Sequence, residues 1–292
     1  MTTPLVPERQ TIRALLLSMA ALALAACSPA KDDTASHADM GHGDGHDHGG
    51  AAARTAATAS LDRFAANRPV TVTVRLTDAT SGQGLGADAF DIVHTQRVHA
   101  LVIDSSLTDY SHAHPAPGGE AGVWTFTFTP RHNRPYRLFL DATRAGAQSY
   151  TVVDLNAGAA AANVEEALSN AATVGGISAR LSFDGPLKAG EAQMGRIAFA
   201  RGGAPFAGLE PVMGAFGHIV GFSADRQSVA HVHPMGAEPT AATDRGGPAV
   251  SFHLEPPKAG FLRIYAQIRV DGQDVFLPFG VNVGPGAASG EP

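Results

Sequence analysis

The feature that most constrains this chain is a histidine pattern that occurs twice, once in each half. Both copies read H-x12-H-x-H-P; they comprise His99, His112, His114 and Pro115, and then His218, His231, His233 and Pro234. The likeness extends beyond the motif, because residues 124–140 align without a gap on residues 250–266, with proline on proline and arginine on arginine. A chain with such an internal repeat is expected to fold as two tandem copies of one domain.

Each copy has the residue pattern of β-strands. In residues 122–130, Trp124, Phe126 and Phe128 alternate with threonines, which is the period of a half-buried strand. Further strand-like runs of apolar and β-branched residues occur at 68–78, 97–104, 134–142, 148–155, 177–185, 194–201, 217–223, 249–256, 260–270 and 275–283. The 33 glycines and 19 prolines favour turns over long helices. We therefore predict an all-β fold of two tandem immunoglobulin-like (cupredoxin-like) antiparallel β-sandwiches.

The N-terminus has the pattern of a bacterial export signal. Arg9 and Arg13 precede a short apolar run, residues 14–26, which is too short for a membrane span. The run ends in LAAC, which resembles the lipobox of bacterial lipoproteins, and Cys27 is the sole cysteine of the chain. We expect a lipid anchor on Cys27 and a periplasm-facing location, at the outer rather than the inner membrane because Ser28 follows. The alternative is an ordinary signal peptide with Cys27 incidental.

These patterns predict six segments along the chain. They are a signal peptide at 1–26, a disordered His-rich tether at 27–66, a first sandwich at 67–155, a linker with at most one short helix at 156–174, a second sandwich at 175–285 and a tail at 286–292.

The tether carries histidines among aspartates and glycines: His37, His42, His46 and His48. Several imidazoles on a flexible segment can converge on one ion, so we predict weak, unselective metal capture there. The alternative is a solvated, low-complexity linker to the membrane without metal affinity.

The repeated motif has the geometry of a metal site. Residues i and i+2 of a strand point to the same side, so His112 and His114 share a face, and a neighbouring antiparallel strand can bring His99 beside them. Three convergent imidazole nitrogens are a common frame for Cu²⁺ or Zn²⁺. We therefore predict one such site in each sandwich. Packed histidines, or a hydrogen-bonded motif at the sandwich rim, would be the structural alternative.

The two copies differ in the residues beside the motif. The second has Met213 and Met235, whose soft sulfur would favour Cu(I), or which pack in the core or rim. The first has Asp104 and Asp109 in its connecting loop. Further histidines without a counterpart in the other copy receive no role: His94, His132 and His253.

Charge and motif content exclude other classes of function. The net charge is −6 and no Lys/Arg-rich block occurs, which argues against nucleic acid as a partner. Neither histidine motif has an adjacent glutamate that could act as a general base, and no nucleophile elbow is present, so we expect no enzymatic activity.

At the level of whole motifs, residues 93–115 and 209–234 resemble YtkA-like bacterial envelope proteins. That resemblance implies immunoglobulin-like domains and an association with copper and other heavy-metal handling, and it matches all six motif histidines. Together these features predict a lipoprotein that binds a transition metal, copper before zinc, for sequestration, buffering or delivery, with a metal-efflux or metal-delivery protein as partner. The alternative is a protein-interaction module of the envelope in which the histidines are structural.

Overall fold

The structure, a computed structural model, describes residues 54–232 and 234–286. The predicted signal peptide, Cys27, the tether histidines, the last residues of the tail and His233 lie outside the described residues. Within the described part of the chain, no helix is long and apolar enough to cross a membrane.

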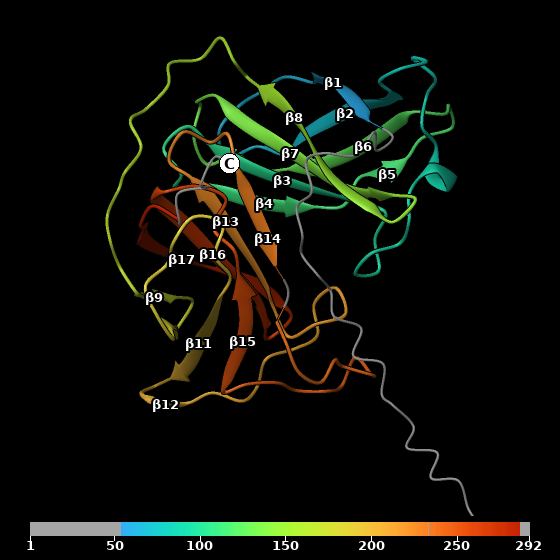
Figure 1. The fold of residues 1–292 in the computed structure, drawn as a ribbon. Coiled ribbons are helices and arrows are strands. Elements are labelled where there is room, and N and C mark those ends of the chain that lie inside the picture. The colour runs from blue at the N-terminus through green and yellow to red at the C-terminus, as the bar shows by residue number, and fades with distance from the viewer. Residues whose placement is uncertain (1–53, 233, 287–292) are drawn as a thin grey trace, which may run out of the picture. The chain divides into compact units, whose positions relative to one another are not determined.

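The first repeat is a sandwich of two four-stranded antiparallel sheets, in the orders β1-β2-β6-β5 and β4-β3-β7-β8 (Figure 1). A short 3-10 helix, Ala87–Ala89, lies between β2 and β3. The strands are β1 (Thr55–Leu61), β2 (Val70–Asp78), β3 (Val98–Asp104), β4 (Tyr110–Ala113), β5 (Ala116–Pro117), β6 (Val123–Phe128), β7 (Tyr136–Arg144) and β8 (Ala147–Leu155).

The second repeat has the same plan. One sheet has the order β12-β11-β10-β9, with β15 also paired to β11, and the other has the order β14-β13-β16-β17. Its strands are β9 (Ala171–Val174), β10 (Ile177–Phe183), β11 (Gln193–Arg201), β12 (Ala204–Pro205), β13 (His218–Ser223), β14 (Val229–Val232), β15 (Ala249–Leu254), β16 (Gly260–Val270) and β17 (Gln273–Val283). The prediction of two tandem immunoglobulin-like antiparallel sandwiches is confirmed.

The segment boundaries differ from the prediction at two places. Strand β1 pairs along its length with β2, so the first sandwich begins upstream of residue 67, inside the segment predicted to be a disordered tether. Strand β9 pairs with β10 and occupies the end of the predicted linker. The rest of the linker has turns and irregular structure without a helix, and it is hydrogen-bonded to the first repeat, since the amide of Ala162 donates to the Ser105 hydroxyl oxygen at 2.9 Å.

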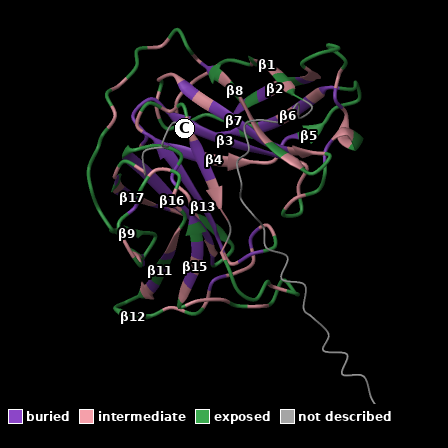
Figure 2. Ribbon diagram, viewed as in Figure 1, coloured by how far each residue is buried: buried purple, intermediate pink, exposed green. Residues whose placement is uncertain are grey.

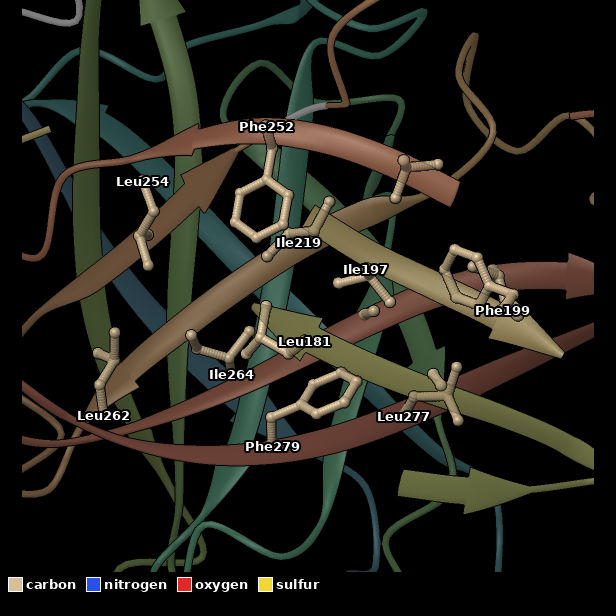
Figure 3. Packing of buried hydrophobic residues seen from close by; sticks show 14 of the residues in the cluster. Leu181, Ile197, Phe199, Ile219, Phe252, Leu254, Leu262, Ile264, Leu277 and Phe279 are labelled. Atoms are coloured by element: carbon tan, nitrogen blue, oxygen red, sulfur yellow. The ribbon is translucent and has the colours of Figure 1, made fainter. Parts of the chain in front are cut away.

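Each sandwich has its own apolar core between its two sheets. In the first, Trp124, Phe126 and Phe128 are buried as the alternation predicts. The core of the second is built from both of its sheets, where Phe199 and Phe252 face Ile264 and Phe279 (Figure 3). Strands of the outer sheets, such as β2 and β10, alternate between buried and exposed residues, as expected for a sheet with one covered face.

The inner sheets are different, because their central strands are buried along the whole of both faces. Every residue of β3 and β13 is buried, and β13 is purple throughout in Figure 2. A strand without alternation needs a second apolar partner on its outer face. Here that partner is the inner sheet of the other repeat. The two sheets meet in what we call the docking core: Leu101, Ile103, Leu107, Tyr110, Phe139, Val220, Phe222, Val229, Phe261 and Tyr265.

Strand alternation places the motif histidines on this docking face. His99 has the same parity on β3 as Leu101 and Ile103, and His218 has the same parity on β13 as Val220 and Phe222. The docking face of each inner sheet is therefore apolar over most of its length and polar where the histidines lie.

Candidate metal centre

Histidines from both repeats converge at the polar end of the docking face. The members of this histidine cluster, as far as the structure describes them, are His99, His112, His114, His218 and His231. Ring centroids of His99 lie 5.4 Å from His112, 5.1 Å from His114 and 5.3 Å from His231. The His112 ring lies 5.8 Å from His218 and 5.4 Å from His231. The two predicted sites, one in each sandwich, are thus brought together into one cluster that the repeats share.

The strand pairing explains how each repeat contributes its part. Strand β3 pairs with β4 so that Leu101 lies opposite His112, and β13 pairs with β14 so that Val220 lies opposite His231. The histidine at the start of the first strand of each pair therefore comes beside the histidines on the second strand, as the thirteen-residue spacing predicts. Docking of the two sheets then adds the histidines of the opposite repeat.

Two tight turns, at residues 93–96 and 212–215, hold the ring nitrogens of His99 and His218 that point away from the cluster. The Nε2 of His99 lies 3.2 Å from the carbonyl oxygen of Val93, and the Nε2 of His218 lies 3.1 Å from that of Val212. A carbonyl oxygen can only accept a hydrogen bond, so Nε2 carries the proton in both rings. In the neutral imidazole, Nδ1 of each ring then carries the lone pair.

His112 and His231 are fixed by residues of the opposite repeat. The Nδ1 of His231 donates to Oδ2 of Asp141 at 2.8 Å, and the Nδ1 of His112 donates to Oε1 of Gln267 at 2.9 Å. The orientation of the Gln267 amide follows from its own donor, since its Nε2 is 3.1 Å from a carboxylate oxygen of Asp274, which can only accept. In the neutral form of His112 and of His231, Nε2 therefore carries the lone pair.

Two of these lone pairs face each other directly. The Nδ1 of His99 lies 3.2 Å from the Nε2 of His112, and both rings have already donated their N–H elsewhere. Neutral imidazoles in this arrangement have no proton to share, so the contact is repulsive unless a cation lies between them. Two nitrogens bound to one tetrahedral Zn²⁺ or similar ion at about 2.0–2.1 Å are about 3.3 Å apart. The separation in the structure matches that geometry.

A third nitrogen can join this pair. One ligand nitrogen from each of His99, His112 and His231 lies within 4.8 Å of the other two. His114 is adjacent, with its ring 5.0 Å from that of His112, and its Nε2 is buried without a hydrogen-bond partner among the described residues. Buried polar atoms are ordinarily satisfied, so an unsatisfied imidazole nitrogen at this position is a second indication of a ligand.

The surroundings favour the neutral form of four of the imidazoles, those of His99, His112, His114 and His218. Burial lowers the pKa of His99, and it lowers the pKa of His112 and His218 well below the usual range. A proton on His231 would lower the pKa of each of these rings further. Burial, followed by His99 and His231, lowers the pKa of His114 to about 4. Neutral imidazole is the form that binds metal, so these four rings have the protonation state that a metal ligand needs.

The other polar residues noted near the motifs lie outside the histidine cluster. Asp104 and Asp109 are buried and hold the β3–β4 loop: Asp104 accepts from Ser106 at 2.6 Å, and Asp109 accepts from Tyr136 at 2.6 Å. These hydrogen bonds give the two carboxylates a structural role. His253 is exposed on β15, on the outer sheet of its sandwich.

The two predicted methionine ligands occupy different places. Met235 is 49% exposed, and the pocket of about 220 Å³ that it lines contains none of the cluster histidines that the structure describes. Met213 is half-buried at the first central position of the turn that holds His218, with φ of 52°. The equivalent turn position in the first repeat is His94, with φ of 49°.

Three functional candidates were missed by sequence reasoning. The first is His94, whose exposed ring lies 6.5 Å from that of His99 and 6.3 Å from that of His218. The signal was present, because VHTQ at 93–96 and VMGA at 212–215 precede their motif histidines by the same spacing. The others are Asp141 and Gln267, which align with each other in the gap-free repeat alignment when it is continued by one residue.

Comparisons with known proteins give little beyond the fold. The family described as "Domain of unknown function (DUF8832)" matches residues 172–285, which is the second sandwich. No curated protein matches the chain.

Several solved structures are similar in a general way. Salmonella alpha-2-macroglobulin is 12% identical over 78% of this chain and 16% of its own length, with a TM-score of 0.24. Invasin, a bacterial integrin-binding protein, is 12% identical over 76% of this chain and 39% of its own, with a TM-score of 0.22. A marsupial T cell receptor is 9% identical over 81% of this chain and 75% of its own, with a TM-score of 0.21. The chain thus spans about a sixth of the macroglobulin and less than half of invasin.

Proposed function

We propose that this protein is a metal-binding lipoprotein of the bacterial cell envelope. It faces the periplasm from a lipid anchor on Cys27 and binds one transition-metal ion, copper before zinc, in the histidine cluster that its two sandwiches share. Its role is sequestration, buffering or delivery of the ion rather than catalysis. The His-rich tether gathers ions near the membrane, and the cluster holds them.

The observation that carries the proposal is the facing pair of lone pairs on His99 and His112, 3.2 Å apart. Carbonyl, carboxylate and amide oxygens accept a hydrogen bond from one ring nitrogen of each of four histidines. The other nitrogen of each ring, which carries the lone pair in the neutral form, is then directed into the cluster. Hydrogen bonds of this kind to the outer nitrogen are the usual support of metal-binding histidines. A purely structural histidine cluster would instead be expected to share its protons within the cluster.

Copper is preferred over zinc on ligand chemistry. All candidate ligands are imidazole nitrogens, which suit both ions, and divalent copper binds a given nitrogen site more tightly than zinc. The resemblance of the motif to envelope proteins associated with copper handling points the same way. An exposed histidine at the edge of the cluster, His94, suits a site from which the ion must also leave.

The test is metal content and affinity of the full chain, with the four tether histidines changed to serine so that only the cluster can bind. Copper and zinc content is measured by mass spectrometry after dialysis, and affinity by competition with a chelator of known strength. The matched variant adds His99→Gln and His231→Gln, and a control adds His132→Gln and His253→Gln outside the cluster. Circular dichroism and thermal unfolding confirm that each variant is folded.

We expect about one copper ion per chain, lost in the cluster variant and retained in the control. Two ions per chain, each removed by mutating one repeat only, would restore the picture of independent sites. No tightly bound metal in the parent protein would leave the histidines with a structural role, and would favour an interaction module of the envelope instead.

A further inference from the structure

The two ligand histidines on β4 and β14 are each held by the opposite repeat. Asp141, on β7 of the first repeat, accepts from His231 of the second at 2.8 Å. Gln267, on β16 of the second repeat, accepts from His112 of the first at 2.9 Å. Asp141 is 4% exposed and Gln267 is 3% exposed, so water does not compete for either contact.

Both acceptors are themselves anchored within their own sheet. The Gln148 amide donates to both carboxylate oxygens of Asp141, at 2.9 and 3.1 Å. The Gln267 amide donates to Asp274 at 3.1 Å, and Asp274 also pairs with Arg269 at 2.7 Å. Positions 141 and 148 correspond to 267 and 274 in the repeat alignment. The same two positions thus hold an aspartate and a glutamine in both repeats, in opposite order.

The reversal makes two otherwise equivalent ligands unequal. A carboxylate behind a metal-binding imidazole raises the basicity of its lone pair and stabilises the positive charge that the ring acquires on binding. An amide oxygen fixes the same ring orientation with less charge stabilisation. Of the two rings, only His231 has a carboxylate directly behind it.

We infer that Asp141 and Gln267 are the positioning residues of the metal centre, each fixing the ligand histidine of the opposite repeat, and that Asp141 makes His231 the strongest ligand. This inference rests on the proposed metal-binding function. It also means that neither sandwich alone can form the centre, because each would lack a ligand histidine of its partner and the acceptor that orients its own.

The test compares copper affinity and the Cu²⁺ electron paramagnetic resonance spectrum among variants of the full chain with the tether histidines changed to serine. Asp141→Asn keeps the shape and removes the charge, and a four-site exchange (Asp141→Gln, Gln148→Asp, Gln267→Asp, Asp274→Gln) moves the carboxylate behind His112. Asp154→Asn is the control, since it removes a carboxylate from the same sheet that pairs with Arg137 instead, at 2.8 Å.

We expect Asp141→Asn to weaken copper binding about 10- to 100-fold and to alter the spectrum, as loss of an outer partner commonly does. The four-site exchange should recover most of the affinity, and the control should match the parent. Parent-like affinity and spectrum in Asp141→Asn would overturn the inference while leaving the proposed function intact. If Asp141→Asn does not fold, the exchange decides alone: a folded exchange variant with affinity as weak as the cluster variant would also overturn it. A parent protein that binds no copper would remove the proposed function itself.

Discussion

Phe222 offers the sharpest test of the idea that metal binding depends on docking of the two sandwiches. Its ring is fully buried, on the face of β13 that points to the first repeat. It lies 5.3 Å from the ring of Tyr110 and 5.9 Å from that of Phe139, both in the first repeat. Phe222→Ala therefore removes contacts between the repeats rather than contacts within the core of the second sandwich.

The size of the effect follows from the buried ring. Truncation of a buried phenylalanine to alanine costs about 3–5 kcal/mol, which here weakens docking. Because the ligand nitrogens come from both repeats, metal affinity can fall by at most the same free energy, about two to four powers of ten. A smaller loss of affinity means that the remaining contacts still hold the two sandwiches together. Adding Phe139→Ala should then separate them.

The assay is copper competition on the tether-substituted full chain, with amide hydrogen exchange of β3 and β13 to report docking. The matched control is Phe252→Ala, because that ring is equally buried but lies in the core of the second sandwich (Figure 3). There it packs on Phe183 of the same sandwich. The control should lower the unfolding temperature while leaving copper affinity unchanged in the folded protein. Parent-like affinity in the Phe139→Ala/Phe222→Ala variant, with exchange showing that β3 and β13 have opened, would refute the shared centre.

Three further outcomes follow from the same geometry. The metal-free protein should lose stability as pH falls from about 6.5, where the histidines of the unfolded chain begin to protonate. The reason is that burial lowers the folded-state pKa of His99, His112 and His218. Urea titrations should show that the free energy of unfolding falls by up to about 1.4 kcal/mol per pH unit for each of these histidines. Copper at a hundredfold excess over its dissociation constant should raise the free energy of unfolding by about 2.7 kcal/mol, and an unchanged thermal transition would contradict specific binding to the folded state. His94→Ala should slow copper uptake and release more than it changes affinity, as measured by stopped-flow exchange with a chelator, whereas His132→Ala should change neither.

Much of the fold is predictable from local pattern alone. The alternation in residues 122–130 predicts β6 and its buried face, and the repeat alignment predicts the equivalent strand β15. Strand β1 escapes prediction because residues 55–61 hold mainly alanine, threonine and serine, so their half-buried pattern has no strong apolar period. Its place in the sheet comes from pairing with β2, which is a tertiary effect.

The sequences of β3 and β13 contain a signal of the docking between the repeats. The runs VHALVID and HIVGFS are apolar at both parities, which a strand with one solvent face would not be. That pattern predicts a second covered face. His99 alternates in step with Leu101 and Ile103 along the strand, so it lies on that same face. Which surface covers the face is not a local property, because the contact between His112 and Gln267 joins residues 155 positions apart.

Fusion of the repeats into one chain explains why the centre can be unequal. In a symmetric dimer of a single repeat, the same residue would stand at positions 141 and 267, since a twofold interface is self-complementary. Two aspartates would bury two carboxylates beside one ion, and two glutamines would leave the bound cation without a counter-charge. A covalent duplication frees the two positions to diverge. Here one carboxylate supports His231 and one amide supports His112, while backbone carbonyls support the other two rings. In the proposed metal centre, the repeated histidines would supply the ligands, and the reversed order of their partners would set which ligand binds the ion most tightly.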